Sequence, residues 1–146
     1  MPVRYFALIY GVVFLAVGIA GFGPGLVPQP AADLSGPDAV FGRLFGLFPI
    51  NALHNLVHIA FGIWGLAAYR SFSGARLYAR AVAVIYAVLM VMGLIPVLKT
   101  TFGLIPLYGH NVWLHALLAM VAAYFGFAPA HSVGGGAPVT TRSHHA

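Results

Sequence analysis

The chain has 146 residues, 61% of them hydrophobic and only 6% charged, and its mean hydropathy is +0.93. Because a soluble domain carries about 25% charged residues, this composition indicates an integral membrane protein in direct contact with the lipid bilayer. The net charge of +5 comes from basic residues scattered between apolar runs, which excludes a nucleic-acid-binding patch, and the lack of cysteine excludes disulfides and thiolate ligands.

Four apolar runs follow one another along the chain, each close to the about 20 residues that a helix needs to cross a bilayer. They cover about residues 5–22, 49–69, 79–98 and 111–127. The first run is longer than the apolar region of a signal peptide, which has about 7–15 residues, so we interpret it as a structural helix. The sequence therefore predicts an all-α membrane fold, a four-transmembrane-helix bundle in a single domain of residues 1–128.

The basic residues predict how this bundle is oriented. If the chain crosses the membrane four times, five basic residues fall on the side of the termini and two on the other side. The first group is Arg4, Arg70, Arg76, Arg80 and Arg142, and the second is Arg43 and Lys99. Because cytoplasmic connections are enriched in Lys and Arg, we expect both termini in the cytoplasm.

Two segments lie outside the apolar runs. The connection after the first run begins with turn-forming residues and ends in "AVFGRLFGLF", which predicts a short helix along the outer interface at residues 39–48. Residues 129–146 have no hydrophobic periodicity and predict a mobile cytoplasmic tail. The histidines of this tail could bind a metal, but a solvated tail is the preferred interpretation; they are His131, His144 and His145.

The two halves of the chain resemble each other. "FGLFPINALHNLVH" at residues 45–58 and "FGLIPLYGHNVWLH" at residues 102–115 share F-G-L-x-P, a His-Asn pair and a final His. Upstream, "IYGVVFLAVG" at residues 9–18 is similar to "IYAVLMVMG" at residues 85–93. Since two spans return the chain to the same side, we expect two helix-pair repeats of parallel topology, related by an axis along the membrane normal.

Polar residues gather at the starts of the second and fourth runs, where each costs free energy in hydrocarbon unless it has a partner. Most are separated by three, four or seven positions, so they share helix faces, and two diagonal helices of a four-helix ring would turn these faces toward the centre. We therefore expect an outer-leaflet cluster between the second and fourth helices. It contains His54, His58 and His115, with Asn51, Asn55 and Asn111 as a polar network and His110 at its mouth.

Two interpretations of this cluster stand side by side. In the first, Asn and His side chains bond to one another and to free backbone groups, which fixes the helix pairing and needs no cofactor. In the second, the cluster is a ligand set. His54 and His58 at i and i+4, together with His115, would then form a three-nitrogen site for copper or zinc. Alternatively, one His from each half would ligate a haem iron or the magnesium of a (bacterio)chlorophyll.

The sequence favours a protein that is not an enzyme. No span contains a paired carboxylate, and neither a G-x-S-x-G motif nor a phosphate-binding loop occurs. A small transporter is the third choice, because the halves of the spans beyond the histidines are apolar and would not continue a proton path.

The stretches "NALHNLVH" and "HNVWLH", within a four-span chain, resemble a bacterial membrane family, domain of unknown function 4383. The resemblance covers roughly residues 5–127 and implies four helices in a bacterial cytoplasmic (inner) membrane, with no known activity. The family often has an acidic residue before the Asn of the fourth span, where this chain has His110. We expect a structural or accessory subunit, in contact with the bilayer and with a larger membrane complex or further copies of itself.

Overall fold

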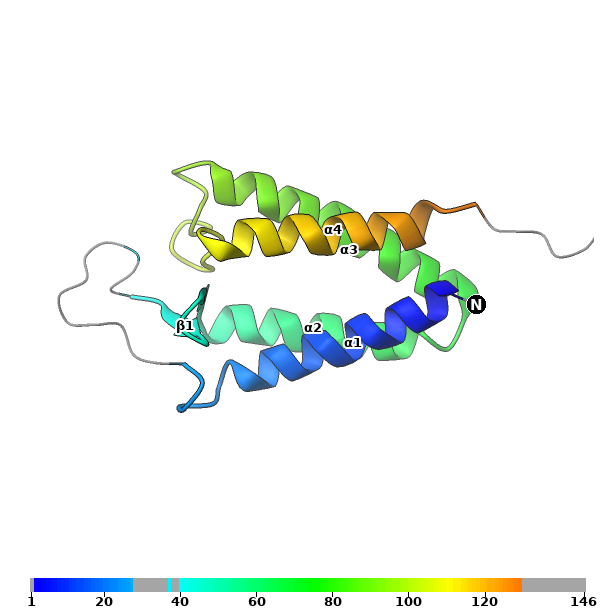
Figure 1. The fold of residues 1–146 in the computed structure, drawn as a ribbon, viewed down its shortest axis with the longest axis horizontal. Helices are drawn as coiled ribbons and strands as arrows, with labels where there is room; N and C mark the ends of the chain where they lie inside the picture. The colour runs from blue at the N-terminus through cyan, green and yellow to red at the C-terminus, as the bar shows by residue number, and fades with distance from the viewer. Residues whose placement is uncertain (1, 28–36, 38–39, 130–146) are drawn as a thin grey trace, which may run out of the picture.

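The computed structural model describes residues 2–27, 37 and 40–129, which form four helices and one small hairpin. The elements are α1 (Pro2–Ala20), β1 (Gly42–Leu44), β2 (Phe48–Ile50), α2 (Ala52–Ala68), α3 (Phe72–Leu94) and α4 (His110–Phe127). Figure 1 shows the helices lying side by side along the long axis, with the hairpin at one end and the N-terminus at the other. We call these two ends the hairpin end and the N-terminal end. The predicted all-helical architecture is confirmed.

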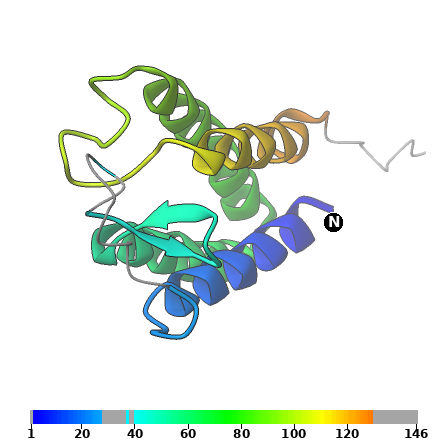
Figure 2. The ribbon, with the colours of Figure 1, turned by 60° about the vertical axis from the view of Figure 1, so that its left-hand side comes forward.

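The helices associate as two pairs. α1 packs along α2 and α3 packs along α4, whereas contacts between the pairs are fewer and are made mainly by α1 with α3. The pairs are separate in the turned view of Figure 2, with the hairpin in front. Aromatic side chains fill the space between them, and Phe6, Phe14, Tyr78 and Tyr86 are all buried.

Glycines bring α1 and α2 close together. A Cβ on Gly65 would lie 2.8 Å from the Cα of Gly11, and a Cβ on Gly62 would lie 2.7 Å from the backbone nitrogen of Leu15. Such distances leave no room for a side chain, so the two backbones touch directly. Close backbone contact of this kind is the usual means of helix association in lipid, where the hydrophobic effect between helices is absent.

The prediction of an interfacial helix at residues 39–48 is wrong for those of its residues that the structure describes. They form part of the antiparallel hairpin, in which Gly42 pairs with Ile50 and Leu44 pairs with Phe48. Phe45 and Gly46 have φ angles of 53° and 72° and therefore reverse the chain in the left-handed region, which ends any helix.

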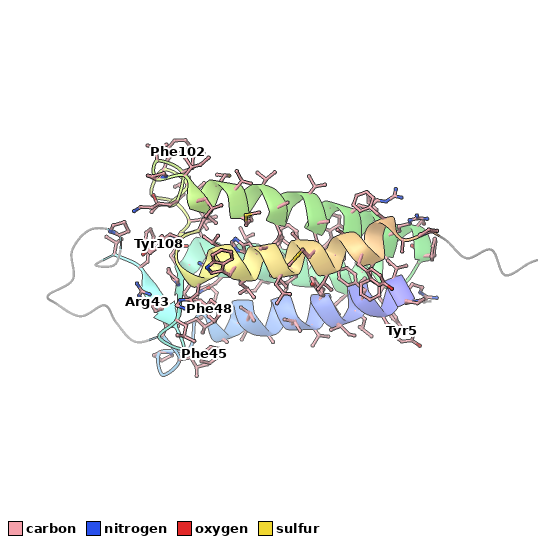
Figure 3. All side chains as sticks on the ribbon, turned by 45° about the horizontal axis from the view of Figure 1, so that its top comes forward. Tyr5, Arg43, Phe45, Phe48, Phe102 and Tyr108 are labelled. Carbon is pink, nitrogen blue, oxygen red and sulfur yellow. The ribbon has the colours of Figure 1, made fainter. Side chains whose placement is uncertain are left out.

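The same backbone conformation recurs in the second half. Phe102 and Gly103 stand where Phe45 and Gly46 stand in the F-G-L-x-P motif, and their φ angles are 58° and 88°. Figure 3 shows Phe45 and Phe102 at the hairpin end, each in a connection that leads into a His-bearing helix. The sequence resemblance between the halves is thus accompanied by a resemblance in backbone geometry.

The helix bounds differ most from the prediction in α3, which was expected at about 79–98. It begins at Phe72 because the Ser71 hydroxyl accepts a hydrogen bond of 3.0 Å from the backbone of Gly74 and caps the first turn. It ends at Leu94 because Ile95 precedes Pro96, and a residue before proline is driven out of the helical region. Charged residues in the first turns had made this segment look like a connection.

Arginines cap the helix ends at the N-terminal end of the bundle. Arg4 Nε donates to the Tyr69 carbonyl at 2.8 Å, at the end of α2. Arg80 Nε and Arg76 Nε donate to the Gly126 carbonyl near the end of α4, at 2.9 and 3.2 Å. These bonds satisfy carbonyl groups that have no partner within their own helix.

In the part of the chain that the structure describes, three helices are long and apolar enough to cross a membrane, namely α1, α3 and α4. The fourth apolar helix, α2, has 17 residues and is preceded by the extended strand β2. These features identify a membrane protein.

Candidate functional site: a chamber of three histidines

The first turns of α2 and α4 meet at the hairpin end, and the way α2 begins determines what lies there. Ile50 ends the preceding strand, and Asn51 then takes an extended conformation with φ −148°. Its side-chain oxygen accepts a hydrogen bond of 2.9 Å from the backbone nitrogen of His54. This N-cap fixes the rotation of the helix, so that His54 and His58 point into the bundle.

Three histidines come together in the interior. His54, His58 and His115 are 4%, 8% and 2% exposed. The ring centroids of His54 and His58 are 4.6 Å apart, and those of His54 and His115 are 6.3 Å apart. The predicted meeting of these side chains from α2 and α4 is therefore what the structure shows.

A small cavity adjoins these rings, with a volume of about 90 Å³. Its polar lining consists of the three imidazoles and Asn111, and the rest is apolar, including Leu44 and Phe48 of the hairpin. We call this cavity and its three imidazoles the histidine chamber. The hairpin that replaced the expected interfacial helix forms part of its wall.

Each imidazole of the histidine chamber has an unused nitrogen. The Nδ1 atoms of His54, His58 and His115 are buried and have no hydrogen-bond partner within the described part of the chain. Buried polar atoms in native proteins nearly always have a partner in the protein, in water or in a bound ion. The expected bonding between Asn and His side chains does not account for these three atoms.

The chamber is not a preformed metal site. Within residues 2–27, 37 and 40–129, no group of three or more His, Asp or Glu side chains is already arranged to hold a metal ion. The rings are instead held by aromatic neighbours. Phe14 stacks on His58 with ring centroids 5.6 Å apart, and Tyr86 meets His115 edge-on at 5.2 Å.

The asparagines bond to backbone groups, which is part of what the first interpretation of the cluster expected. Asn111 Nδ2 donates to the carbonyls of Pro49 at 2.7 Å and Pro106 at 3.1 Å, and Asn51 Nδ2 donates to the Leu104 carbonyl at 2.6 Å. Asn111 thus joins the two prolines that occupy equivalent places in the F-G-L-x-P motifs. These bonds tie the hairpin and the connection before α4 to each other.

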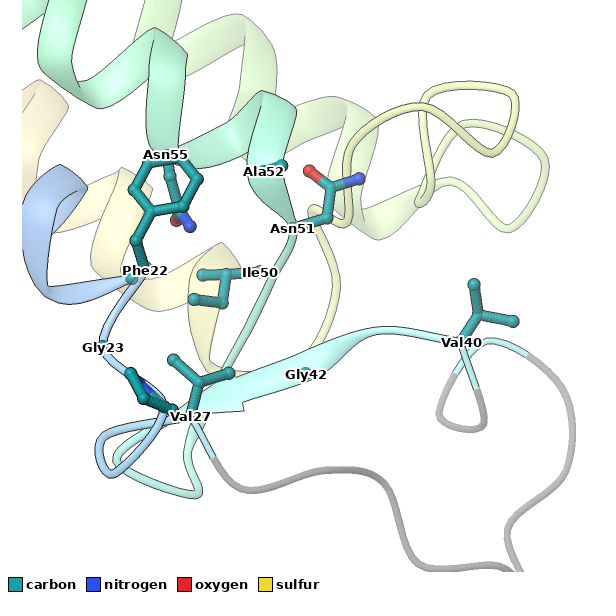
Figure 4. Close-up of a pocket in the computed structure, with 11 residues that line it drawn as sticks. Phe22, Gly23, Val27, Val40, Gly42, Ile50, Asn51, Ala52 and Asn55 are labelled. Carbon is teal, nitrogen blue, oxygen red and sulfur yellow. The ribbon is translucent and has the colours of Figure 1, made fainter.

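Asn55 lies apart from the histidine chamber. Its buried side chain lies against Gly21 at the end of α1, where any Cβ would collide with it. Together with Asn51 it lines an open pocket of about 370 Å³ beside the hairpin. Figure 4 shows the two side chains in this pocket, with Asn55 behind Phe22 and Asn51 directed toward the connection before α4. The residues expected on one face therefore serve two sites.

His110 also stays outside. It is the first residue of α4 and is exposed, and its ring centroid is 6.2 Å from that of Phe48. His110 does not join the three buried rings. Its neighbour Phe48 lines the chamber, but His110 itself does not. The tail histidines lie outside the described residues.

The core beyond the histidines is less apolar than the sequence indicated. Tyr78 is fully buried and its hydroxyl has no hydrogen-bond partner among the described residues, while the Tyr10 hydroxyl donates to the Leu118 carbonyl at 3.3 Å. Tyrosine is usually interpreted as an interface residue in membrane helices, which is why this part of the core was missed. The available signal on α1 was the i, i+4, i+8 spacing of Phe6, Tyr10 and Phe14.

The fold and the chamber define a class: a small helical membrane protein in which two helix pairs enclose buried histidines at one end. Residues 4–128 match the family described as Domain of unknown function (DUF4383). The chain therefore belongs to that family, as the resemblance of its two His-Asn stretches implied. No curated protein and no solved structure was found to match the chain.

Proposed function

We propose that this chain is a four-span protein of the bacterial cytoplasmic membrane that works without catalysis, as a structural or accessory subunit of a larger membrane complex. The observation that carries this proposal is the use of side-chain amides to join the two helix pairs. Asn111 reaches Pro49 in the other half, and Asn51 reaches Leu104 in return. Polar groups in the membrane that bond to backbone in this way give a bundle a single fixed arrangement.

The fourth span is α2. At about 1.5 Å per residue its 17 residues extend roughly 26 Å, slightly less than the about 30 Å of a bilayer core. The hairpin precedes α2 along the chain, and because a two-stranded hairpin leaves the backbone groups of its outer edges unpaired, we place it in the polar interface at the end of the span.

The orientation follows from the basic residues of the two ends. Arg4, Arg70, Arg76 and Arg80 belong to the N-terminal end, and Arg43 and Lys99 belong to the hairpin end. Such a bias supports a cytoplasmic N-terminal end and a hairpin end on the outer side. It also supports two helix-pair repeats of the same topology.

Cysteine labelling tests this arrangement directly, because the chain contains no cysteine of its own. Ser73→Cys, at the start of α3, and Leu47→Cys, in the hairpin turn, are both exposed positions at opposite ends. In intact cells, a membrane-impermeant maleimide is expected to label Leu47→Cys alone and to reach Ser73→Cys only after lysis. Labelling of Ser73→Cys alone from outside would refute the orientation, and labelling of both positions from outside would show that α2 does not cross the membrane.

The accessory role is tested by native size. The cavity between the histidines measures about 90 Å³, well below the about 300–1,000 Å³ of a usual ligand pocket, so we expect the protein to act through contacts in the membrane. Blue-native electrophoresis of source membranes, with the chain at its natural level, should place it in an assembly of fixed stoichiometry with another membrane protein. Migration as a 15.4 kDa monomer would contradict the proposal.

A second candidate function, cofactor binding, is favoured by the three unpartnered imidazole nitrogens. For haem or a (bacterio)chlorophyll, the chamber of about 90 Å³ is too small, since pockets for ligands of drug size measure about 300–1,000 Å³. A macrocycle would have to separate the helix pairs and break the bonds of Asn111. The structure therefore favours a small occupant over a large one.

A further inference from the structure

Two arginines of α3 meet at one backbone oxygen at the N-terminal end of the bundle. Arg76 Nε and Arg80 Nε both donate to the Gly126 carbonyl, at 3.2 and 2.9 Å. Arg76 Nη2 also donates to the Ala128 carbonyl at 3.1 Å, just beyond the end of α4. Two cations that share one neutral acceptor repel each other, so a negative group close to both would stabilise the pair.

The described part of the chain supplies no such group. It contains neither Asp nor Glu, and the two acidic residues of the sequence, Asp33 and Asp38, belong to the connection between α1 and β1. We propose that Arg76 and Arg80 together bind the phosphate group of an anionic phospholipid. The inference goes beyond the accessory role and does not depend on it; it requires only that α3 crosses the membrane, as its length and composition allow.

Both guanidinium groups keep donors for a phosphate. A guanidinium has five N–H donors in a flat fork that fits phosphate oxygens. In its bonds to the rest of the described chain, Arg80 uses Nε and Arg76 uses Nε and Nη2, so further N–H groups are left for a ligand. Arg80 is exposed and Arg76 is partly exposed. Because the Gly126 carbonyl already holds both side chains in place, binding would order them little further, which favours affinity.

The surroundings of the two cations are those of a membrane interface. Arg76 Cζ lies 6.0 Å from the ring centroid of Phe72, and Arg80 Cζ lies 5.3 Å from that of Phe127. These rings are 45% and 56% exposed, so they reach the surrounding lipid. An aromatic ring and an arginine beside each other are typical of the level at which the head groups of the lipids begin.

An exposed apolar row continues from this site along α3. With Arg80 included, successive members of the row are three or four positions apart and therefore share one face of the helix. The apolar members are Leu77, Val84, Val88 and Val91, and they are all exposed. A phosphate site that leads into such a row matches a phospholipid, whose acyl chain would lie along the valines. Inorganic phosphate would use the arginines alone.

Native mass spectrometry of the full chain tests the proposal. The protein is stripped of lipid in mild detergent and titrated with phosphatidylglycerol, and separately with phosphatidylcholine that has the same acyl chains. Both lipids carry a phosphate, but the choline group cancels its charge. Phosphatidylglycerol should bind more tightly, and an excess of inorganic phosphate should not displace it. Equal binding of the two lipids, or displacement by inorganic phosphate, would overturn the assignment.

The arginines are tested singly and together. Affinity for phosphatidylglycerol should fall about fivefold in Arg80→Gln and about 25-fold in the double variant with Arg76→Gln, since each basic residue near an anionic lipid contributes about 1 kcal/mol. Arg70→Gln is the matched control, because it removes the same charge from an exposed position at the same end of the bundle. It should bind as the parent does. Unchanged binding in the double variant, or an equal loss in Arg70→Gln and Arg80→Gln, would overturn the assignment to this pair.

A variant that keeps the charge guards against loss of the fold. Lysine still attracts phosphate as a point charge, although it lacks the flat fork. The double variant Arg76→Lys with Arg80→Lys should therefore keep the preference for phosphatidylglycerol over phosphatidylcholine. Loss of that preference in a folded lysine variant overturns the site, even where the glutamine variant does not elute as a folded species. Neither result bears on the native-size test of the accessory role.

Discussion

The two ends of the bundle use their polar side chains differently. At the N-terminal end, Arg4, Arg76 and Arg80 all donate to backbone carbonyls at the ends of α2 and α4. At the hairpin end, Asn51 and Asn111 likewise donate to backbone carbonyls, but His54, His58 and His115 each keep an Nδ1 that has no partner among the described residues. The comparison separates groups that hold the fold from groups that the fold could do without. We predict that the histidines are in the second class.

The largest effect is expected at the close backbone contact between α1 and α2. Gly65→Leu places a side chain where Gly11 and the Ala7 carbonyl are already in contact, and α1 must move away from α2. We expect a loss of about 3 kcal/mol or more in the free energy of unfolding, at the upper limit for overpacking. Unfolding in mixed detergent micelles, followed by circular dichroism, measures it. Ala67→Leu, at an exposed position on the same helix, should change stability little and serves as the control.

The next largest effect should come from the asparagine that joins the halves. Asn111→Leu keeps the volume but leaves the buried carbonyls of Pro49 and Pro106 without their donor. The expected loss is about 1–3 kcal/mol, which is the usual range for an unsatisfied buried group. Asn51→Ser is the matched variant, because serine can still cap α2 but cannot supply the amide donor to Leu104, and it should lose less because Asn51 is partly exposed. If the two variants behaved alike, burial would not be what makes the Asn111 bonds important.

At the N-terminal end the expected loss is smaller. Arg80→Gln removes a charged donor from the Gly126 carbonyl, which still accepts a bond from Arg76. Since the carbonyl keeps one partner, we expect a loss of about 0.5–1 kcal/mol in unfolding free energy. The double variant Arg76→Gln with Arg80→Gln should lose more than the sum of the two single variants. Strict additivity would show that the two arginines do not share the carbonyl.

The smallest effect is expected at His110. Its side chain is exposed and lies beside Phe48, so His110→Ala should change the free energy of unfolding by less than about 0.5 kcal/mol. A larger loss, measured in the same unfolding assay, would mean that His110 helps to hold the hairpin against α4. An exposed histidine would then contribute more to the stability of the fold than we predict for the buried ones.

The helices and the meeting of the three histidines could be predicted from the sequence, because both depend on local periodicity. Apolar runs near the length of a membrane span gave the helices, and i to i+4 spacing placed His54 and His58 on one face. The repeated F-G-L-x-P and His-Asn motifs then brought His115 to the same depth. The structure agrees with each of these steps.

The hairpin and the particular backbone partners of the asparagines could not be predicted in this way. An apolar stretch such as "AVFGRLFGLF" fits a helix or a strand, and the outcome depended on the left-handed backbone at Phe45 and Gly46. The bonds from Asn111 to Pro49 and Pro106 join residues 62 and 5 positions apart, so only the folded arrangement reveals the more distant one. Spacing predicts which residues share a face, but it does not say which backbone groups come within reach.

The most direct test of the central claim is to make the histidine chamber apolar and to measure stability. His58→Leu removes an unpartnered nitrogen and keeps a similar volume against Phe14. We predict an unfolding free energy within about 0.5 kcal/mol of the parent, or higher, because replacing an unsatisfied polar group by an apolar one is near neutral or stabilising. In the same assay Asn111→Leu should lose about 1–3 kcal/mol. A comparable loss in His58→Leu would show that the histidines hold the fold and would contradict the distinction between the two classes.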